Sequence, residues 1–215
     1  MAQAQLRTVL VRLESTLTAM ERLAAASQKW VGVSFPPGVP KFSVHYKETV
    51  TALAFLRGFI ALEIFLEQSF ILYLLGLKPP AGPKPKRLVK PTTKKLAILA
   101  VVGDRNYTDW YKWSQLKARA KKYFVDGKPY TDALNGRKLL FEEMITIRNA
   151  LAHSSQHSQE QFKQLVRSKL SGSYPPNLSV GGSLSMTIPA TSPPESFLDY
   201  YLNNLSTVAG LVILT

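Results

Sequence analysis

The sequence predicts an all-α protein, a bundle of four to five main helices with a Pro-rich basic insert and a C-terminal helix. Apolar residues recur at spacings of three and four over long stretches, as they do along one face of an α-helix. They also make up 46% of the 215 residues, which is enough to form a core. We expect a single helical domain over residues 1–215.

The first two helices differ in how their apolar residues are distributed. The second helix, over about 47–75, is apolar almost all round, which predicts a position in the middle of a bundle. Charged and amide side chains interrupt it and would be costly in lipid, so we expect a buried helix rather than a membrane span. The interrupting residues are Arg57, Glu63, Glu67 and Gln68. The first helix has a single apolar stripe formed by Leu6, Leu10, Leu13, Leu17, Met20 and Ala24.

The range 77–95 is a Pro-rich basic insert that contains no acidic residue. Proline breaks the hydrogen-bond pattern of a helix, so we expect no packed helix here. Two interpretations stay open, a solvated loop and an arm that contacts phosphates, which needs only positioned charge. The candidate phosphate-binding residues of this arm are Lys84, Lys86, Arg87 and Lys90.

The rest of the chain is expected to be helical with one long loop. The apolar run 96–102 is a strand or the start of a helix, since periodicity cannot decide. Residues 171–194, rich in Ser, Gly and Pro, are expected to loop out. Ser192-Pro193-Pro194-Glu195 resembles a capping box, which would start the C-terminal helix. Three further helices are expected over about 108–124, 135–153 and 159–170.

The charge balance narrows the class of partner. Lys and Arg total 27 against 14 acidic residues, a formal net charge of +13. Such an excess favours a polyanionic partner, either nucleic acid or an anionic membrane surface, over a protein that is merely basic. The chain has no cysteine, which excludes disulfides and thiolate metal sites and fits a cytoplasmic protein.

The helix over 135–153 carries an unusual polar set on its outward side. Its predicted core stripe consists of Leu140, Met144, Ile147 and Leu151. Asn149 and His153 are four residues apart, so they are neighbours on the helix surface, about 150–180° away from that stripe. Arg148 lies at the edge between the two faces. His157 extends the row if the helix continues, although Ser154 and Ser155 could equally end it.

These residue types fit metal-independent cleavage of RNA. Histidine can transfer a proton at neutral pH. Arginine can grip a phosphate and stabilise extra charge at phosphorus, and asparagine can orient either partner. RNA brings its own nucleophile, the 2′-hydroxyl, so the protein needs to supply only a base and phosphate stabilisation.

The segment Arg148-Asn149-Ala150-Leu151-Ala152-His153 resembles the R-(N/D/H)-x-x-x-H motif of the HEPN superfamily. Ala61-Leu62-Glu63-Ile64-Phe65-Leu66-Glu67 looks like the earlier long helix of that family, and the resemblance spans roughly residues 45–165. It implies a bundle of four or five helices and a homodimer that brings two Arg/His sets together. Active members cut single-stranded RNA without metal and leave 2′,3′-cyclic phosphate ends.

We therefore expect an endoribonuclease that acts as a toxin or antiviral defence effector. The expected catalytic residues are Arg148, Asn149 and His153. The arm residues would bind RNA, with no metal, cofactor or membrane partner, and with an antitoxin or sensor protein as a possible further partner. The alternatives are a non-catalytic HEPN module that binds RNA or nucleotides and a helical protein-interaction adaptor.

Three further residues are expected to support the catalytic set. Glu63 and Glu67 would each sit in the buried helix, where a carboxylate needs a partner, and pairing with Arg148 is favoured over a metal site. His157 is the third supporting candidate. Trp110 and Trp113, close to several lysines, could stack nucleic-acid bases, but packing in the core is the favoured interpretation.

Overall fold

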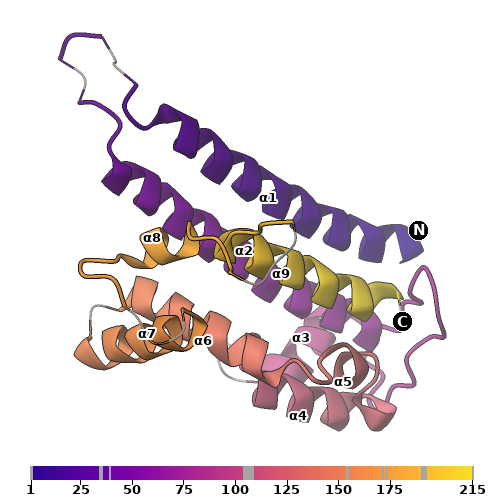
Figure 1. The fold of residues 1–215 in the computed structure, drawn as a ribbon. Coiled ribbons are helices and arrows are strands. Elements are labelled where there is room, and N and C mark those ends of the chain that lie inside the picture. The colour runs from indigo at the N-terminus through magenta and orange to yellow at the C-terminus, as the bar shows by residue number, and fades with distance from the viewer. Residues whose placement is uncertain are drawn as a thin grey trace. The chain divides into compact units, whose positions relative to one another are not determined.

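The computed structural model describes residues 2–33, 36–38, 40–103, 109–153, 155–170, 172, 174–189 and 193–214. Within these ranges the chain forms nine α-helices and one 3-10 turn, with no strand beyond two isolated antiparallel bridges (Figure 1). The all-α prediction is therefore confirmed. The helices are α1 (Ala2–Trp30), α2 (Val44–Leu74), α3 (Lys94–Val102), α4 (Trp113–Tyr123), α5 (Tyr130–Ala133), α6 (Lys138–Ala152), α7 (Gln156–Lys169), α8 (Val180–Leu184) and α9 (Phe197–Leu214).

The chain divides into two compact units. Unit 1 contains residues 1–15, 60–142 and 205–215, and unit 2 contains residues 16–59 and 143–204. The boundary falls within α1, α2, α6 and α9, so these four helices contribute residues to both units.

The structure decides one helix that the sequence left open and places the start of another later than predicted. The apolar run 96–102 belongs to a helix, α3, because Thr93 caps its first turn by accepting a hydrogen bond from the backbone N–H of Leu96 (3.2 Å). Helix α4 begins at Trp113, later than predicted. The predicted start at Thr108 lies outside the described residues. Trp110 precedes the helix and is buried, only 3% exposed.

An aromatic cluster around Phe70 of α2 forms the centre of unit 1. Its ring lies 5.3 Å from that of Trp110, 5.0 Å from Phe124 and 5.1 Å from Tyr130. Ser69 Oγ and the Tyr130 hydroxyl share a buried hydrogen bond of 2.9 Å. These contacts join α2 to elements some forty to sixty residues later in the chain, and they place Trp110 in the core, as predicted. Trp113 is half-buried, and its indole N–H donates to the Leu134 carbonyl (3.1 Å).

In unit 2, the range 171–194 contains a helix where the sequence predicts a loop. Helix α8 packs closely on the first turns of α2. A Cβ atom at Gly181 would lie 1.8 Å from the Glu48 carbonyl oxygen, so only glycine allows this approach. Ser179 Oγ caps α8 by accepting from the Gly182 N–H and donates to the Glu48 carboxylate (2.7 Å).

Helix α9 begins with a cap at Ser196 rather than at Ser192. Ser196 Oγ accepts from the Asp199 N–H (3.1 Å) and donates to the Asp199 carboxylate (2.7 Å). Ser196 is thus a side-chain N-cap whose hydroxyl also binds the carboxylate of Asp199, three residues later. Ser192 itself lies outside the described residues.

Helix α2 is long and apolar enough to cross a bilayer by length and composition, and 44% of its most apolar window is buried. One such helix is weak evidence for a membrane span, because core helices of soluble proteins have the same composition. Its buried side chains include Phe55 and Phe59 in unit 2 and Phe65 and Phe70 in unit 1.

Candidate functional site

The candidate catalytic segment lies at the corner between α6 and α7. Helix α6 ends at Ala152, and the backbone N–H of His153 donates to the Asn149 carbonyl (2.9 Å), so His153 completes the last turn. Ser155 then caps α7, accepting from the Ser158 N–H (3.2 Å). The helix over 135–153 therefore does not continue, and His157 belongs to the next helix.

The buried stripe of α6 is rotated slightly from the predicted one. Met144 (0% exposed) and Ile147 (3%) are buried as expected. Leu140 and Leu151 are only half-buried, and Phe141 and Ala150 are buried in their place. The prediction relied on the spacing of apolar residues, whereas the neighbouring chain decides which side chains of the helix are enclosed. Asn149 is half-buried and His153 is exposed.

The structure brings the three candidate catalytic side chains together. Arg148 Nη1 donates to Asn149 Oδ1 (3.3 Å) and lies 3.4 Å from His153 Nε2. Both contacts are at the long end of hydrogen-bond distances. A guanidinium N–H can only donate, so the hydrogen bond requires His153 Nε2 to be the acceptor and the ring proton to be on Nδ1.

Gln159 of α7 fixes the backbone of this corner. Its side-chain amide N–H donates to the carbonyl of Ala150 (2.9 Å) and lies 3.5 Å from the carbonyl of His153. These are two of the carbonyls that the end of a helix leaves without a helical partner. Gln159 is thus a positioning candidate that no sequence pattern singles out, because only the turn between α6 and α7 brings it there.

The supporting candidates lie elsewhere. Glu63 of α2 is half-buried, whereas Glu67 is exposed and lines a groove of unit 1 beside Gln68. The expectation that the whole helix is buried is therefore wrong at Glu67, because one side of α2 faces solvent there. Both glutamates belong to unit 1 and Arg148 to unit 2, so their pairing stays a prediction. His157 is exposed on α7.

The basic arm is hydrogen-bonded through its backbone to the chain at the end of α4. Arg87 forms an isolated antiparallel bridge with Phe124, supported by hydrogen bonds from the Leu88 N–H to the Tyr123 carbonyl (2.9 Å) and from the Val125 N–H to the Lys86 carbonyl (2.8 Å). Side chains alternate along such an extended segment, so Arg87 points to one side and its neighbours to the other.

Arg87 differs from the other described arm residues, because its side chain binds the end of α2. Its Nη1 donates to the Leu74 carbonyl at the end of α2 (3.0 Å), where a cation also complements the helix dipole. The guanidinium fills the space beside Gly76, since a Cβ there would lie 2.5 Å from Arg87 Cζ. Lys84, Lys86 and Lys90 are exposed. Lys84 and Lys86 line a hollow together with Lys128 and Asp132.

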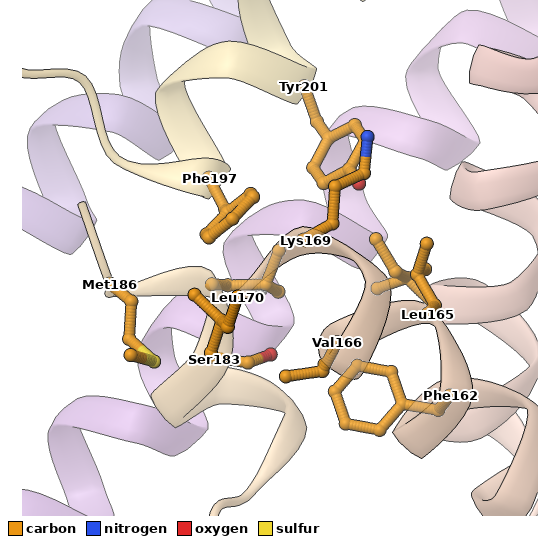
Figure 2. A pocket seen from close by; sticks show the side chains of 11 residues that line it. Phe162, Leu165, Val166, Lys169, Leu170, Ser183, Met186, Phe197 and Tyr201 are labelled. Carbon is orange, nitrogen blue, oxygen red and sulfur yellow. The ribbon is translucent and has the colours of Figure 1, made fainter. Parts of the chain in front are cut away.

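A second polar group on α6, centred on Glu143, has partners from two other helices of unit 2. Lys169 Nζ of α7 lies 2.7 Å from one carboxylate oxygen, and the Tyr201 hydroxyl of α9 donates to the other (3.1 Å). Burial, and then the Glu143 charge, raises the pKa of Tyr201, which therefore remains a donor. Figure 2 shows Lys169 and Tyr201 beside a small apolar cavity of about 20 Å³, lined also by Phe162, Val166 and Phe197.

The cavity has room for roughly one water molecule, and its walls are mostly apolar. The Glu143 group therefore joins helices, whereas the Arg148 group can present a cation, an amide and a proton acceptor to a phosphate.

Comparisons with family models, with curated proteins and with solved structures found no match for this chain.

Proposed function

We propose that this protein is a metal-independent endoribonuclease of the HEPN type, with Arg148, Asn149 and His153 as its catalytic residues. The observation that supports this most directly is the contact of Arg148 Nη1 with both Asn149 Oδ1 and His153 Nε2. A phosphate held by Arg148 would lie within one side-chain length of a histidine that can accept a proton. The exposed position of His153 leaves it open to a macromolecular substrate.

The proposed reaction begins when an RNA phosphate replaces His153 Nε2 as acceptor of the Arg148 N–H. The freed Nε2 lone pair then accepts the proton of the 2′-hydroxyl, and the 2′-oxygen attacks phosphorus. The bond from phosphorus to the 5′-oxygen breaks, giving a 2′,3′-cyclic phosphate and a 5′-hydroxyl. Arg148 stabilises the charge that develops on the phosphoryl oxygens.

The leaving 5′-oxygen needs a proton from a general acid, and one chain supplies one His153. We propose that a homodimer brings the second histidine, protonated, to the leaving group. A strict monomer at micromolar concentration that still cuts RNA would contradict this part of the proposal.

The decisive test is incubation of the purified protein with labelled RNA in EDTA. The wild type should give cyclic phosphate ends, and His153→Ala and Arg148→Ala should both lose cleavage. His45→Ala is the matched control, because His45 is also an exposed histidine next to a helix end and lies outside the candidate set. Cleavage that depends on a divalent metal, or that survives His153→Ala, would defeat the proposal. RNA binding without cleavage would favour a non-catalytic binding module.

The contribution of the arm can be tested separately. Lys84→Glu with Lys86→Glu should weaken RNA binding and flatten its salt dependence, by a slope of about one for each phosphate that is no longer neutralised. Lys121→Glu with Lys122→Glu on α4 is the control, since these two lysines are also exposed. Arg87 is left unchanged in this test, because its contact with Leu74 makes it part of the fold. An unchanged salt slope would make the arm a solvated loop.

A further inference from the structure

Helix α3 of unit 1 is an apolar helix whose outward face is open to solvent. Its sequence is Lys-Lys-Leu-Ala-Ile-Leu-Ala-Val-Val, and Ala97 is its one buried residue. Leu96 is 47% exposed and Leu99 is 53% exposed. Lys95, Leu96 and Leu99 are spaced by three and four, so they share one face, which is opposite to that of Ala97. Two neighbouring exposed leucines on one face of a short helix form an apolar surface of the kind that marks contact sites.

The helix is held in this position by specific contacts. Thr93 caps its start, and the backbone N–H of Gly103 donates to the Leu99 carbonyl (2.8 Å) at its end. The Tyr123 hydroxyl of α4 donates to the Ala100 carbonyl. A nine-residue helix is not stable in water by itself, so these contacts and the burial of Ala97 are what present the two leucines outward.

The charged side chains that α3 itself carries have one sign. Lys94 and Lys95 lie in the first turn of α3 and are exposed. The sequence contains no acidic residue between Gln68 and Gly103. Leu88 (57% exposed) and Val89 (40%) add exposed apolar side chains to the same stretch of chain, next to Lys90. Glu67 of α2 lies with Lys94 and Ile98 along a groove away from the face of Leu96 and Leu99. The exposed apolar side chains and the two lysines of α3 are complementary to a partner that is apolar and anionic.

We propose that the outward face of α3 is a docking surface for an anionic lipid bilayer, on which α3 lies in the plane of the head groups. The leucines would enter the boundary of the acyl chains, and Lys94 and Lys95 would contact the phosphates and carboxylates of the lipids. RNA would use the lysines and leave the leucines in water. A second copy of the chain would place Lys94 and Lys95 near their own equivalents, so both alternatives fit the charges and the apolar surface less well.

The proposal replaces the sequence-based expectation that no membrane is involved, and it is independent of the proposed RNA cleavage. It describes attachment to one surface of a bilayer and makes no use of α2. The residues that carry it, Lys94, Lys95, Leu96 and Leu99, are separate from the catalytic set and from the arm lysines assigned to RNA.

The test is sedimentation of the full chain with vesicles of phosphatidylcholine, alone or with about 30% phosphatidylserine. The wild type should sediment with the anionic vesicles and not with the neutral ones. Lys94→Gln with Lys95→Gln should weaken this binding by about 25-fold, roughly fivefold for each lysine. Leu96→Gln with Leu99→Gln should weaken it by at least about tenfold, because less apolar area leaves water.

Two controls come from the same unit. Leu139→Gln removes a leucine that is 72% exposed at the start of α6, and Lys121→Gln with Lys122→Gln removes two exposed lysines of α4; neither should change vesicle binding. The far-ultraviolet circular dichroism of each variant should match the wild type. Equal binding to neutral vesicles, or leucine variants that bind as the Leu139→Gln control does, would overturn the proposal. A change of oligomeric state in the leucine variant without lipid would instead assign this face to contacts between copies.

Discussion

Helix α6 carries two polar groups, one centred on Glu143 and the other on Arg148, and the origin of their partners differs. Glu143 is bound by Lys169 of α7 and Tyr201 of α9, both far away in sequence. Arg148 contacts Asn149 and His153, which are one and five residues away. A polar group tied to other helices stabilises tertiary structure, whereas a partly exposed set built at the end of one helix can change partners when a ligand arrives.

The largest expected effect is on catalysis by the group centred on Arg148. His153→Ala should lower RNA cleavage by at least about 10²-fold, the usual loss for a general acid or base. Its melting temperature should stay within about 1 °C of the wild type, because the side chain is exposed. Gel-based assays measure the cleavage rate, and thermal unfolding measures the melting temperature. A large fall in melting temperature would show that His153 supports the fold as Glu143 does.

Glu143→Ala should instead lower the stability of the fold. Loss of the carboxylate leaves the Lys169 ammonium and the buried Tyr201 hydroxyl without this acceptor, which should lower the free energy of unfolding by about 2 kcal/mol. Chemical denaturation measures this change. Glu142→Ala is the control, since Glu142 is exposed and its pair with Lys138 (3.6 Å) should contribute less than about 0.5 kcal/mol. Equal destabilisation by both variants would remove the distinction between the two groups.

Gln159→Ala tests whether the corner between α6 and α7 positions His153. We expect kcat to fall by roughly fivefold to tenfold with KM nearly unchanged, because the hydrogen bond to the Ala150 carbonyl fixes the backbone and does not touch RNA. The loss of one such bond should cost about 1 kcal/mol of stability. A rise in KM with kcat unchanged would instead indicate that Gln159 contributes to RNA binding.

The smallest expected effect concerns Glu21. The charged neighbour of Glu21 is the negative Asp199, whereas the charged neighbour of Glu143 is the positive Lys169. Burial, and then the charge of Asp199, raises the pKa of Glu21 above 4.5. The folded state therefore holds this proton more tightly, and stability should fall as the pH rises from about 4.5 through the folded-state pKa. Glu21→Gln should remove that decline and raise the melting temperature at pH 7 by about 1 °C. A lower melting temperature at pH 7 would contradict the sign.

Periodicity was sufficient to predict the longer helices but not α3, α5 or α8, and it was less reliable for which side chains the helices bury. The stripe of α6 includes Met144 and Ile147 as predicted, but Phe141 and Ala150 replace Leu140 and Leu151. A helical wheel defines a face to within about one residue, and the neighbouring chain decides which side chains are enclosed. Similarly, the Gly-rich stretch around Gly181 suggested a loop, although the missing side chain is what lets α8 approach Glu48.

Spacing along the chain is enough to specify the all-helical class and the closeness of Arg148, Asn149 and His153, because both are properties of a local helix. Three other features depend on tertiary packing: Gln159 fixes the backbone of that set, Arg87 binds the end of α2, and α3 exposes Leu96 and Leu99. Each of them requires contacts between residues separated in sequence, or depends on which face a neighbouring element covers. No local pattern of residues specifies such contacts, since they form only when separate elements pack against one another.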